Sequence, residues 1–360
     1  MPAPRRPADA PHDLPTAALR SSLLAWYDGA RRALPWRALP GARPDPWRVL
    51  VSELMLQQTT VATVRGRFEP FMARFPDLPS LAAAPLDDVL HAWQGLGYYR
   101  RARSLHACAK AVVEHHGGVL PLRYDELLTL PGVGPYTATA VAAIAGGQAM
   151  VAVDANVERV LSRLLAIEAP LPGSRPQLRM AAERLAAADR PADFAQAMME
   201  LGALVCTPRR PGCIVCPWQP TCRAASRGDP ETFPRKLARA ARATRFATAF
   251  LLERADGAFL FRRRPPEGLL GGMIELPATP WLADPAAAVA ARSAAPQPTT
   301  WVAVPGTVKH VFTHIELTVD LWRGRAASTS DGLWMPPARF NELALPTLTK
   351  KLLRHAGLRW

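Results

Sequence analysis

Up to about Arg223, apolar residues recur at the spacing of one face of an α-helix. A short amphipathic helix is predicted over residues 21–31, and a longer one runs from Tyr98 to the Gly117-Gly118 pair. No alternation typical of a strand occurs before Arg223, so residues 21–223 are predicted to be helical. The i, i+3, i+4, i+7 pattern is seen in Trp47, Leu50, Val51 and Leu54, in Leu86, Val89, Leu90 and Trp93, and in Val157, Val160, Leu161 and Leu164.

Beyond residue 243 the pattern becomes that of strands. Residues 246–252 and 258–261 flank Asp256-Gly257, a strong signal for a β-hairpin. Residues 244–360 therefore predict a second, smaller α+β domain. Its other expected elements are strands over 300–304 and 312–321 and helices over 284–292 and 347–355.

Two stretches carry no such pattern. Residues 224–243 are polar, basic and contain proline, which is typical of a linker. Residues 1–20 are rich in proline, alanine and arginine, and we expect a disordered tail there.

The 360 residues carry a net charge of +14, and 49% of them are hydrophobic. That charge favours nucleic acid or an acidic membrane surface as a partner, while the apolar content is ample for two cores. No apolar run has the length of a membrane span. We therefore expect a soluble intracellular protein.

Residues 124–146 predict two helices joined by a glycine turn. Pro131 ends the first helix, Gly132, Val133 and Gly134 form the turn, and Pro135 begins the second. Glycines allow a ligand to approach the backbone, and the free amides of the next helical turn favour a phosphate. An ordinary helix–turn–helix connection explains the spacing equally well, so the turn alone decides nothing.

Four of the five cysteines lie between residues 206 and 222, namely Cys206, Cys213, Cys216 and Cys222. In a reducing compartment such crowding indicates a metal site rather than disulfides. Four thiolates can hold zinc or an iron–sulfur cluster, and the spacing leaves both open.

Together these motifs resemble those of the helix-hairpin-helix DNA glycosylases that carry a 4Fe–4S cluster. Within that group, residues 52–59 (Ser-Glu-Leu-Met-Leu-Gln-Gln-Thr) and 95–99 (Gly-Leu-Gly-Tyr-Tyr) are similar to adenine DNA glycosylases of the MutY type. The resemblance implies a helical catalytic region with the cluster at the four cysteines, followed by a Nudix-like domain. It also implies duplex DNA with A:8-oxoguanine or A:G mispairs as substrate, and base excision repair as the activity. From the same resemblance we expect a cytoplasmic, nucleoid-associated protein of bacterial type that is a monomer and does not bind membranes.

The resemblance implies a role for each of four residues in breaking the adenine–sugar bond. Glu53 protonates the departing base, and Asp154 stabilises the oxocarbenium ion or bonds to it transiently. Tyr136 and Asn156 hydrogen-bond near the sugar and Asp154. The pKa values of Glu53 and Asp154 must differ if one carboxyl is to be an acid while the other is ionised.

Because adenine must leave the duplex to react, other matching residues are expected to hold DNA or the flipped base. Gln58 and Tyr98 enter the DNA beside the partner base, while the hairpin residues 132–134 bind the backbone. The remaining matches are Arg32 and Arg37 beside the flipped-base pocket, and Trp36, Gln196 and Met199 in its walls.

The C-terminal residues resemble the Nudix-like module of this family. Residues 268–272 match it, but the carboxylates of a Nudix hydrolase do not follow, which favours binding without hydrolysis. Phe312, Thr313 and His314 resemble the loop that faces 8-oxoguanine, with threonine in place of the usual serine. The family also usually has glycine where Ala155 stands.

Two other functions remain open. An endonuclease III-type glycosylase/lyase shares the hairpin, aspartate and cluster, but it has a lysine at the position of Tyr136, and tyrosine cannot form a Schiff base. A non-catalytic, DNA-binding iron–sulfur protein is the other alternative. It has no need of Glu53, Gln58 and Asp154 together, so their joint presence favours an enzyme. Because Tyr136 also argues against lyase chemistry, we predict a monofunctional glycosylase.

Overall fold

The structure is a computed structural model that describes residues 14–237, 241–265, 267–326 and 331–360. These residues form two compact units, one from residues 14–83 and 104–237 and the other from residues 84–103 and 241–360. The first unit is helical, and the second holds the strands of the described residues. None of the described helices combines the length and apolar character needed to cross a membrane.

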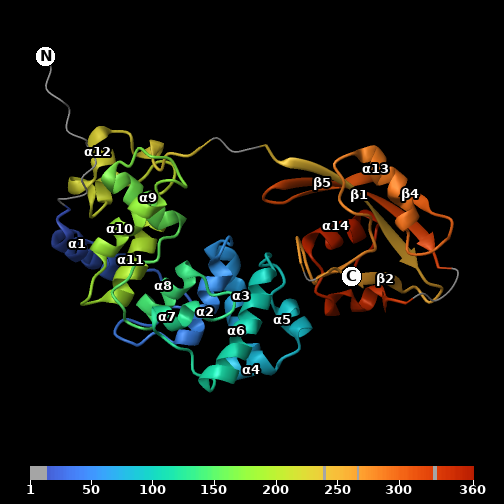
Figure 1. Cartoon of the computed structure of the whole chain (residues 1–360), viewed down its shortest axis with the longest axis horizontal. Coiled ribbons are helices and arrows are strands. Elements are labelled where there is room, and N and C mark those ends of the chain that lie inside the picture. The colour runs from blue at the N-terminus through green and yellow to red at the C-terminus, as the bar shows by residue number, and fades with distance from the viewer. Residues whose placement is uncertain (1–13, 238–240, 266, 327–330) are drawn as a thin grey trace, which may run out of the picture. The chain divides into compact units, whose positions relative to one another are not determined.

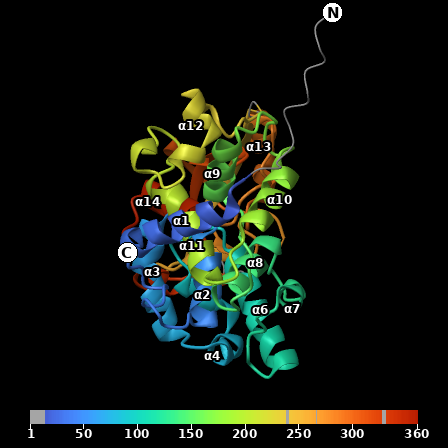
Figure 2. The same cartoon turned by 90° about the vertical axis from the view of Figure 1, so that its left-hand side faces the viewer.

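The helical unit confirms the predicted helical class. Its core lies among α1, α9, α10 and α11, where Tyr27 and Phe194 are fully buried, and both Figure 1 and Figure 2 show these helices next to one another. The helices are α1 (Thr16–Ala30), α2 (Pro46–Leu56), α3 (Val61–Arg74), α4 (Leu78–Ala83), α6 (Arg100–His116), α7 (Tyr124–Leu128), α8 (Pro135–Ile144), α9 (Ala155–Leu165), α10 (Arg175–Leu185), α11 (Pro191–Leu204) and α12 (Arg223–Arg227).

The predicted glycine turn joins α7 to α8. Gly132 has a φ of +74°, a backbone conformation that side chains with a Cβ rarely adopt. A Cβ at this position would also lie 2.2 Å from the Cβ of Ser104 on α6. Gly134 then precedes α8 as its N-cap, and Pro135 occupies the first helical turn. Glycine is thus required by both conformation and close packing.

Two predicted boundaries of the helical region are wrong. α1 begins at Thr16 rather than Ser21, so residues 16–20 are helical; residues 1–13 of the expected tail lie outside the described residues. Leu19 is buried in the core, and the Arg20 guanidinium donates to the carbonyl of Leu185, which holds this first turn in place. Helix α3 was not predicted, because Gly66 and Pro70 interrupt its pattern.

The predicted linker is also wrong for its first half. α12 and a 3-10 turn (Pro230–Thr232) follow the cysteines, and Phe233 behind them is only 2% exposed. The carbonyl of Phe233 accepts from Arg163 Nε at 3.2 Å, and the Arg235 guanidinium lies 4.5 Å from the centre of its ring. Local polarity gives no sign of this packing, because Phe233 is the single aromatic residue in a stretch of polar, basic and small residues.

The second unit contains a mixed sheet. The strands are β1 (Ala243–Glu253), β2 (Phe259–Arg263), β3 (Ile274–Glu275), β4 (Val302–Val311), β5 (Ile315–Arg325) and β6 (Leu333–Met335). Their order is β3-β2-β1-β5-β4, with β6 also pairing with β2. β1 and β5 are parallel from Ala243↔Ile315 to Glu253↔Arg325, and the other pairs are antiparallel.

The helices of this unit are α5 (Leu86–Ala92), α13 (Pro285–Ala290) and α14 (Thr347–His355). The predicted β1–β2 hairpin is confirmed, with Gly257 at a φ of +81°. The strand predicted to start at Phe312 is wrong in its first residues. β4 ends at Val311, and residues 312–314 form a tight turn in which Phe312 N donates to the Ile315 carbonyl at 2.8 Å.

The sequence predicts residues 84–103 as part of the helical region. In the structure they pack with the C-terminal residues and belong to the second unit. His91 Nε2 lies 2.6 Å from the Asn341 carbonyl, and Gln94 Nε2 donates to the Leu343 carbonyl at 2.8 Å. Lys350 Nζ donates to Gln94 Oε1, also at 2.8 Å. Such polar contacts between distant segments leave no trace in the periodicity of either one.

The packing of Phe233 yields a prediction for stability. Phe233→Ala should lower the free energy of unfolding of the helical unit by about 3–5 kcal/mol, because it leaves a cavity under α12. Leu237→Ala is the control, since Leu237 is 63% exposed and its loss should change stability by less than about 0.5 kcal/mol. Urea unfolding of both variants gives the comparison, and equal effects would show that residues 224–237 are a linker after all.

Candidate active site

Glu53 lies on α2, near the C-terminal end of the helix. Asp45 caps the helix by accepting from Trp47 N at 2.9 Å, and Pro46 supplies the first helical position. Most of α2 is buried, and Glu53 is only 6% exposed although it carries a carboxyl group. Tyr136, in the first turn of α8, donates its hydroxyl to Glu53 Oε2 at 2.9 Å. The glycine turn therefore sets the position of a side chain that contacts Glu53.

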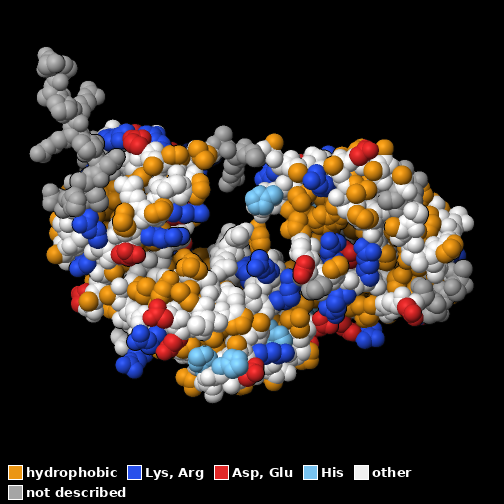
Figure 3. All heavy atoms as spheres, viewed as in Figure 1, with side chains coloured by type: hydrophobic (Ala, Val, Ile, Leu, Met, Phe, Trp, Pro, Cys, Tyr) orange, Lys and Arg blue, Asp and Glu red, His pale blue; other side chains and the backbone are white. Residues whose placement is uncertain are grey.

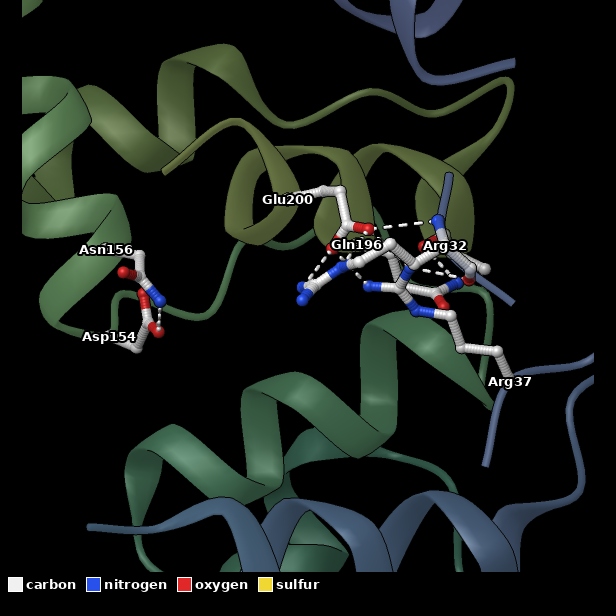
Figure 4. Close-up of polar contacts among 7 residues, drawn as sticks. Arg32, Arg37, Asp154, Asn156, Gln196 and Glu200 are labelled. Atoms are coloured by element: carbon white, nitrogen blue, oxygen red, sulfur yellow. Dashed lines mark hydrogen bonds and ion pairs between the residues drawn. The ribbon is translucent and has the colours of Figure 1, made fainter. Parts of the chain in front are cut away.

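Asp154 is the N-cap of α9, as the sequence predicts. Its Oδ1 accepts from Val157 N at 2.8 Å, and its Oδ2 accepts from Asn156 Nδ2 at 3.0 Å. Figure 4 shows this Asp154–Asn156 pair. Both carboxylate oxygens thus have a donor, an arrangement that stabilises the ionised form.

One cavity of the helical unit, about 650 Å³ in volume, brings most of the predicted residues together. It has the size and mixed lining of a small-molecule site and would hold a purine. The predicted residues that line it are Arg32, Trp36, Arg37, Glu53, Gln58, Tyr136, Asp154, Asn156, Gln196 and Met199.

The two carboxyl groups have different environments. Burial raises the pKa of Glu53 to about 7, assisted by the charge of Asp154 and opposed by the Tyr136 hydrogen bond and by Arg37. Burial also raises the pKa of Asp154, but the donors of Val157 and Asn156 oppose it. The pKa of Tyr136 is raised well above its usual value by burial and the two carboxyls, so its hydroxyl keeps its proton. Near neutral pH, Glu53 can therefore supply a proton.

Other predicted residues do not line this cavity. Gly132, Val133 and Gly134 form the turn before α8 instead.

Gln58, which does line the cavity, has a φ of +56°, a strained conformation for a side chain of its type.

The remaining predicted residues, Tyr98 and the loop residues 312–314, belong to the second unit. The Tyr98 hydroxyl lies 2.9 Å from Thr313 Oγ1, and its backbone φ is +45°. Phe312 stacks on Trp281 with ring centres 5.3 Å apart. The structure therefore places Tyr98 and Thr313, which are both predicted to act at the base opposite adenine, in direct contact.

Two polar residues that sequence reasoning missed contact the predicted ones. Arg159 on α9 donates from Nη2 to Asn156 Oδ1 at 2.9 Å and from Nε to the Cys206 carbonyl at 2.7 Å. Glu200 on α11 is completely buried and accepts from Arg32 and Arg37. The one available signal for Glu200 was an acidic residue inside the apolar run of residues 197–201.

The four cysteines border one small cavity between α9, α11 and α12. Arg163, which is 1% exposed, donates from Nη1 to Cys206 Sγ at 3.3 Å. In the described part of the chain, no three or more His, Cys, Asp or Glu side chains are grouped as ligands of a metal ion. Four sulfur donors beside a buried guanidinium fit a cofactor held by thiolates, since the cation offsets their negative charge.

Comparisons with known proteins define the class. The HhH-GPD superfamily of base excision DNA repair proteins matches residues 51–188, and the NUDIX domain family matches residues 248–355. The solved structure of a thermostable thymine-DNA glycosylase is 28% identical, with a TM-score of 0.53, over 59% of this chain and 97% of that one. The helical unit thus has the fold of helix-hairpin-helix DNA glycosylases.

Sequence relatives identify the family within this class. Adenine DNA glycosylase of Homo sapiens is 38% identical over 94% of this chain and 73% of its own length. That of Mycolicibacterium smegmatis is 44% identical over 64% of this chain and 78% of its own length. The chain belongs to the adenine DNA glycosylase family. It is a DNA repair enzyme of base excision repair, and its partner is DNA.

The buried Glu53 predicts a pH-dependent stability. A folded-state pKa of about 7, against an ordinary 4.5, gives stability that is fully present below about pH 4.5 and lost as the pH rises through about 7. The difference corresponds to about 3 kcal/mol. Glu53→Gln lacks this loss, so above neutral pH it should be more stable than the parent by up to that amount. Urea unfolding between acid and neutral pH measures it, and parallel curves for the two proteins would contradict it.

Proposed function

We propose that the protein hydrolyses the N-glycosidic bond of adenine paired with 8-oxoguanine in duplex DNA, and less efficiently that of adenine paired with guanine. The observation that carries this proposal is the buried Glu53 beside Tyr136 and Asp154 in a cavity that would hold a flipped purine. A buried carboxyl group beside other ionisable side chains in a polar cavity is typical of an active site, because its burial lowers stability. This argues against a non-catalytic DNA-binding protein.

The proposed reaction uses the two carboxyls differently. Glu53 donates its proton to a ring nitrogen of adenine, so that the bond to the sugar breaks with its electron pair leaving on a neutral base. Asp154, held ionised by its two donors, faces the cation that develops on the sugar. Water then adds to the anomeric carbon and gives up a proton to Glu53. Asn156 orients Asp154, and Tyr136 orients Glu53.

We propose that the enzyme is monofunctional. The lyase relatives use an amine where this chain has Tyr136, and a phenol whose pKa is raised by burial is neither an amine nor a ready nucleophile. The product is then an abasic site in an intact strand.

The cofactor that we propose is one 4Fe–4S cluster held by Cys206, Cys213, Cys216 and Cys222. Its support is the shared cavity of the four thiols and the contact of Arg163 with Cys206. The cluster would supply a rigid anionic centre for this loop. The chain's own residues connect the loop to the site, because Arg159 contacts both the Cys206 carbonyl and Asn156.

DNA is proposed to meet both units as a substrate of a monomeric enzyme. In the helical unit the hairpin residues 132–134 hold the backbone, and Arg32, Arg37, Trp36, Gln196 and Met199 receive adenine. Gln58 and Tyr98 hold the strand open beside the partner base. Lys and Arg side chains are spread over the visible face of each unit in Figure 3, which supports an electrostatic contribution to binding.

The loop Phe312-Thr313-His314 is proposed to read 8-oxoguanine. This base differs from guanine by a carbonyl at C8 and a proton on N7, so its reader needs polar groups at that edge. Thr313 offers a hydroxyl that already contacts the Tyr98 hydroxyl, and Phe312 is braced by Trp281. His314 adds a ring that can donate or accept a hydrogen bond.

The excision proposal has a direct test. The parent protein should convert an A:8-oxoguanine duplex to a product that breaks only in hot alkali, with little adduct on borohydride treatment. Glu53→Gln should lower the single-turnover rate by roughly 10²–10⁴-fold, because the general acid is lost. The control is Glu69→Gln, an exposed carboxylate paired with Arg48, which should leave the rate unchanged. Strand breakage without alkali, or a Glu53→Gln rate within a few-fold of the parent, would refute the proposed chemistry.

The reading of 8-oxoguanine has a separate test. Thr313→Val removes the hydroxyl but keeps the shape of the side chain. It should reduce the preference for 8-oxoguanine over guanine by about tenfold, the effect of one lost hydrogen bond of about 1.4 kcal/mol. Dissociation constants for a non-cleavable adenine analogue opposite each base measure this preference. Thr307→Val, at an exposed position of β4, is the control, and an unchanged ratio for Thr313→Val would remove Thr313 from recognition.

A further inference from the structure

Glu200 is a buried carboxylate between two guanidinium groups. Its Oε1 accepts from Arg32 Nε at 2.7 Å and its Oε2 from Arg32 Nη2 at 2.8 Å, a bidentate pair. Arg37 donates from Nη1 to Oε1 at 3.0 Å and from Nη2 to Oε2 at 2.8 Å. The backbone N of Arg32 adds a bond to Oε1 at 3.0 Å. Every lone-pair direction of the carboxylate is therefore engaged.

Glu200, Arg32 and Arg37 form part of the wall of the cavity that contains Glu53. Glu200 lies one helical turn after Gln196 on α11, and both residues line that cavity together with Arg32 and Arg37. Figure 4 shows the Glu200 carboxylate directed at the two guanidiniums, with Gln196 alongside. The side chain of Glu200 is 0% exposed and that of Arg37 only 9%, so solvent screens their charges weakly. Glu200 thus belongs to the site and not to the protein surface.

Of these three charged residues, Arg37 acts directly on Glu53. Burial would raise the pKa of Glu200, but the hydrogen bonds and charges of Arg32 and Arg37 lower it to about 2, so Glu200 is ionised. Arg37 also acts on Glu53, where its positive charge favours the carboxylate form. Without Glu200, two cations would remain in this wall with no anion between them. Arg37, no longer neutralised, would then oppose the protonated state of Glu53 more strongly.

We propose that Glu200 is a positioning residue that fixes Arg32 and Arg37 in the cavity wall and neutralises them, so that Glu53 remains protonated when adenine arrives. This rests on the proposed role of Glu53 as the acid. Bidentate contact fixes the plane of the Arg32 guanidinium, and in the described residues its Nη1 has no hydrogen-bond partner in the protein. That nitrogen can therefore donate to a base.

Other charged and titratable groups around the cavity are accounted for. Tyr136 from α8 and Asp154 before α9 act on Glu53, and Tyr27 from α1 interacts with both Arg37 and Glu200. Glu158 also lines the cavity and forms an ion pair with Arg175. None of these groups stands between Arg32 and Arg37. The remaining charged group in the lining is Arg179.

The test is the pH dependence of single-turnover excision by the full-length, cluster-loaded protein. The rate should fall as the pH rises through the titration of Glu53. In Glu200→Gln this fall should move to lower pH by on the order of one unit, which is about a tenfold lower rate on the alkaline side. In Arg37→Gln it should move to higher pH, because a cation near Glu53 is lost. Opposite shifts from neighbouring residues are not expected from damage to packing.

Two further variants complete the design. Glu168→Gln is the matched control, because Glu168 also lies between two arginines, Arg227 and Arg235, but is 57% exposed; its profile should equal that of the parent. Glu200→Asp keeps the charge and shortens the reach, so it should lower the rate without moving the profile. If Glu200→Gln does not fold, as judged by circular dichroism and iron content, Glu200→Asp and Arg37→Gln carry the test.

The outcomes distinguish this inference from the proposed function. A Glu200→Gln profile that falls in rate but does not shift would overturn the inference and leave a structural role only. A shift of the Arg37→Gln profile to lower pH, or of the Glu200→Asp profile by as much as Glu200→Gln, would also overturn it. A parent protein that releases no adenine would instead refute the proposed function.

Discussion

Burial of an ionisable carboxyl is the physical constraint on which the rest of the helical unit depends. Glu53 must be buried if it is to hold a proton near pH 7, and a group buried in this way lowers the stability of the fold when it ionises. The apolar core around α9 and the buried apolar side chains of α2 compensate for this loss. The neighbouring Asp154 shows the complementary solution, since it is half-buried and receives a backbone and a side-chain donor.

The architecture around these carboxyls follows from that requirement. The glycine turn brings Tyr136 to Glu53, while the first turn of α9 provides the Val157 amide that donates to Asp154. Polar and charged groups complete the surroundings. Glu200 neutralises Arg32 and Arg37, and Asn156 connects Asp154 to Arg159. In a weakly screened cavity each of these charges affects the others, so their balance matters as much as their contacts.

Much of this could be predicted from the sequence where the signal is local. Asp154 as an N-cap, Pro135 in a first turn and the Asp256-Gly257 hairpin are read from neighbouring residues, and all three are confirmed. The fold class and the enzyme family also follow from long, ordered motifs, and the comparisons confirm both.

Features set by tertiary packing could not be predicted in this way. Phe233 is buried by segments far away in the chain, and residues 84–103 bond to residues 341–350. Glu200 has no distinctive neighbours in sequence, because its importance comes from two arginines more than 160 positions away. The sequence predicts strand rather than turn at residues 312–314, because the apolar Phe312 continues the pattern of β4 and β5.

The central claim is that burial raises the pKa of Glu53 to about 7, so that a large fraction of it is protonated at neutral pH. Carbon-13 NMR of the protein labelled at the glutamate side-chain carboxyl measures this directly, with Glu53→Gln identifying the resonance. We expect a titration midpoint of about 7 for Glu53. A midpoint near the ordinary value of 4.5 would show that Glu53 is a carboxylate in the resting enzyme, and it would contradict the account.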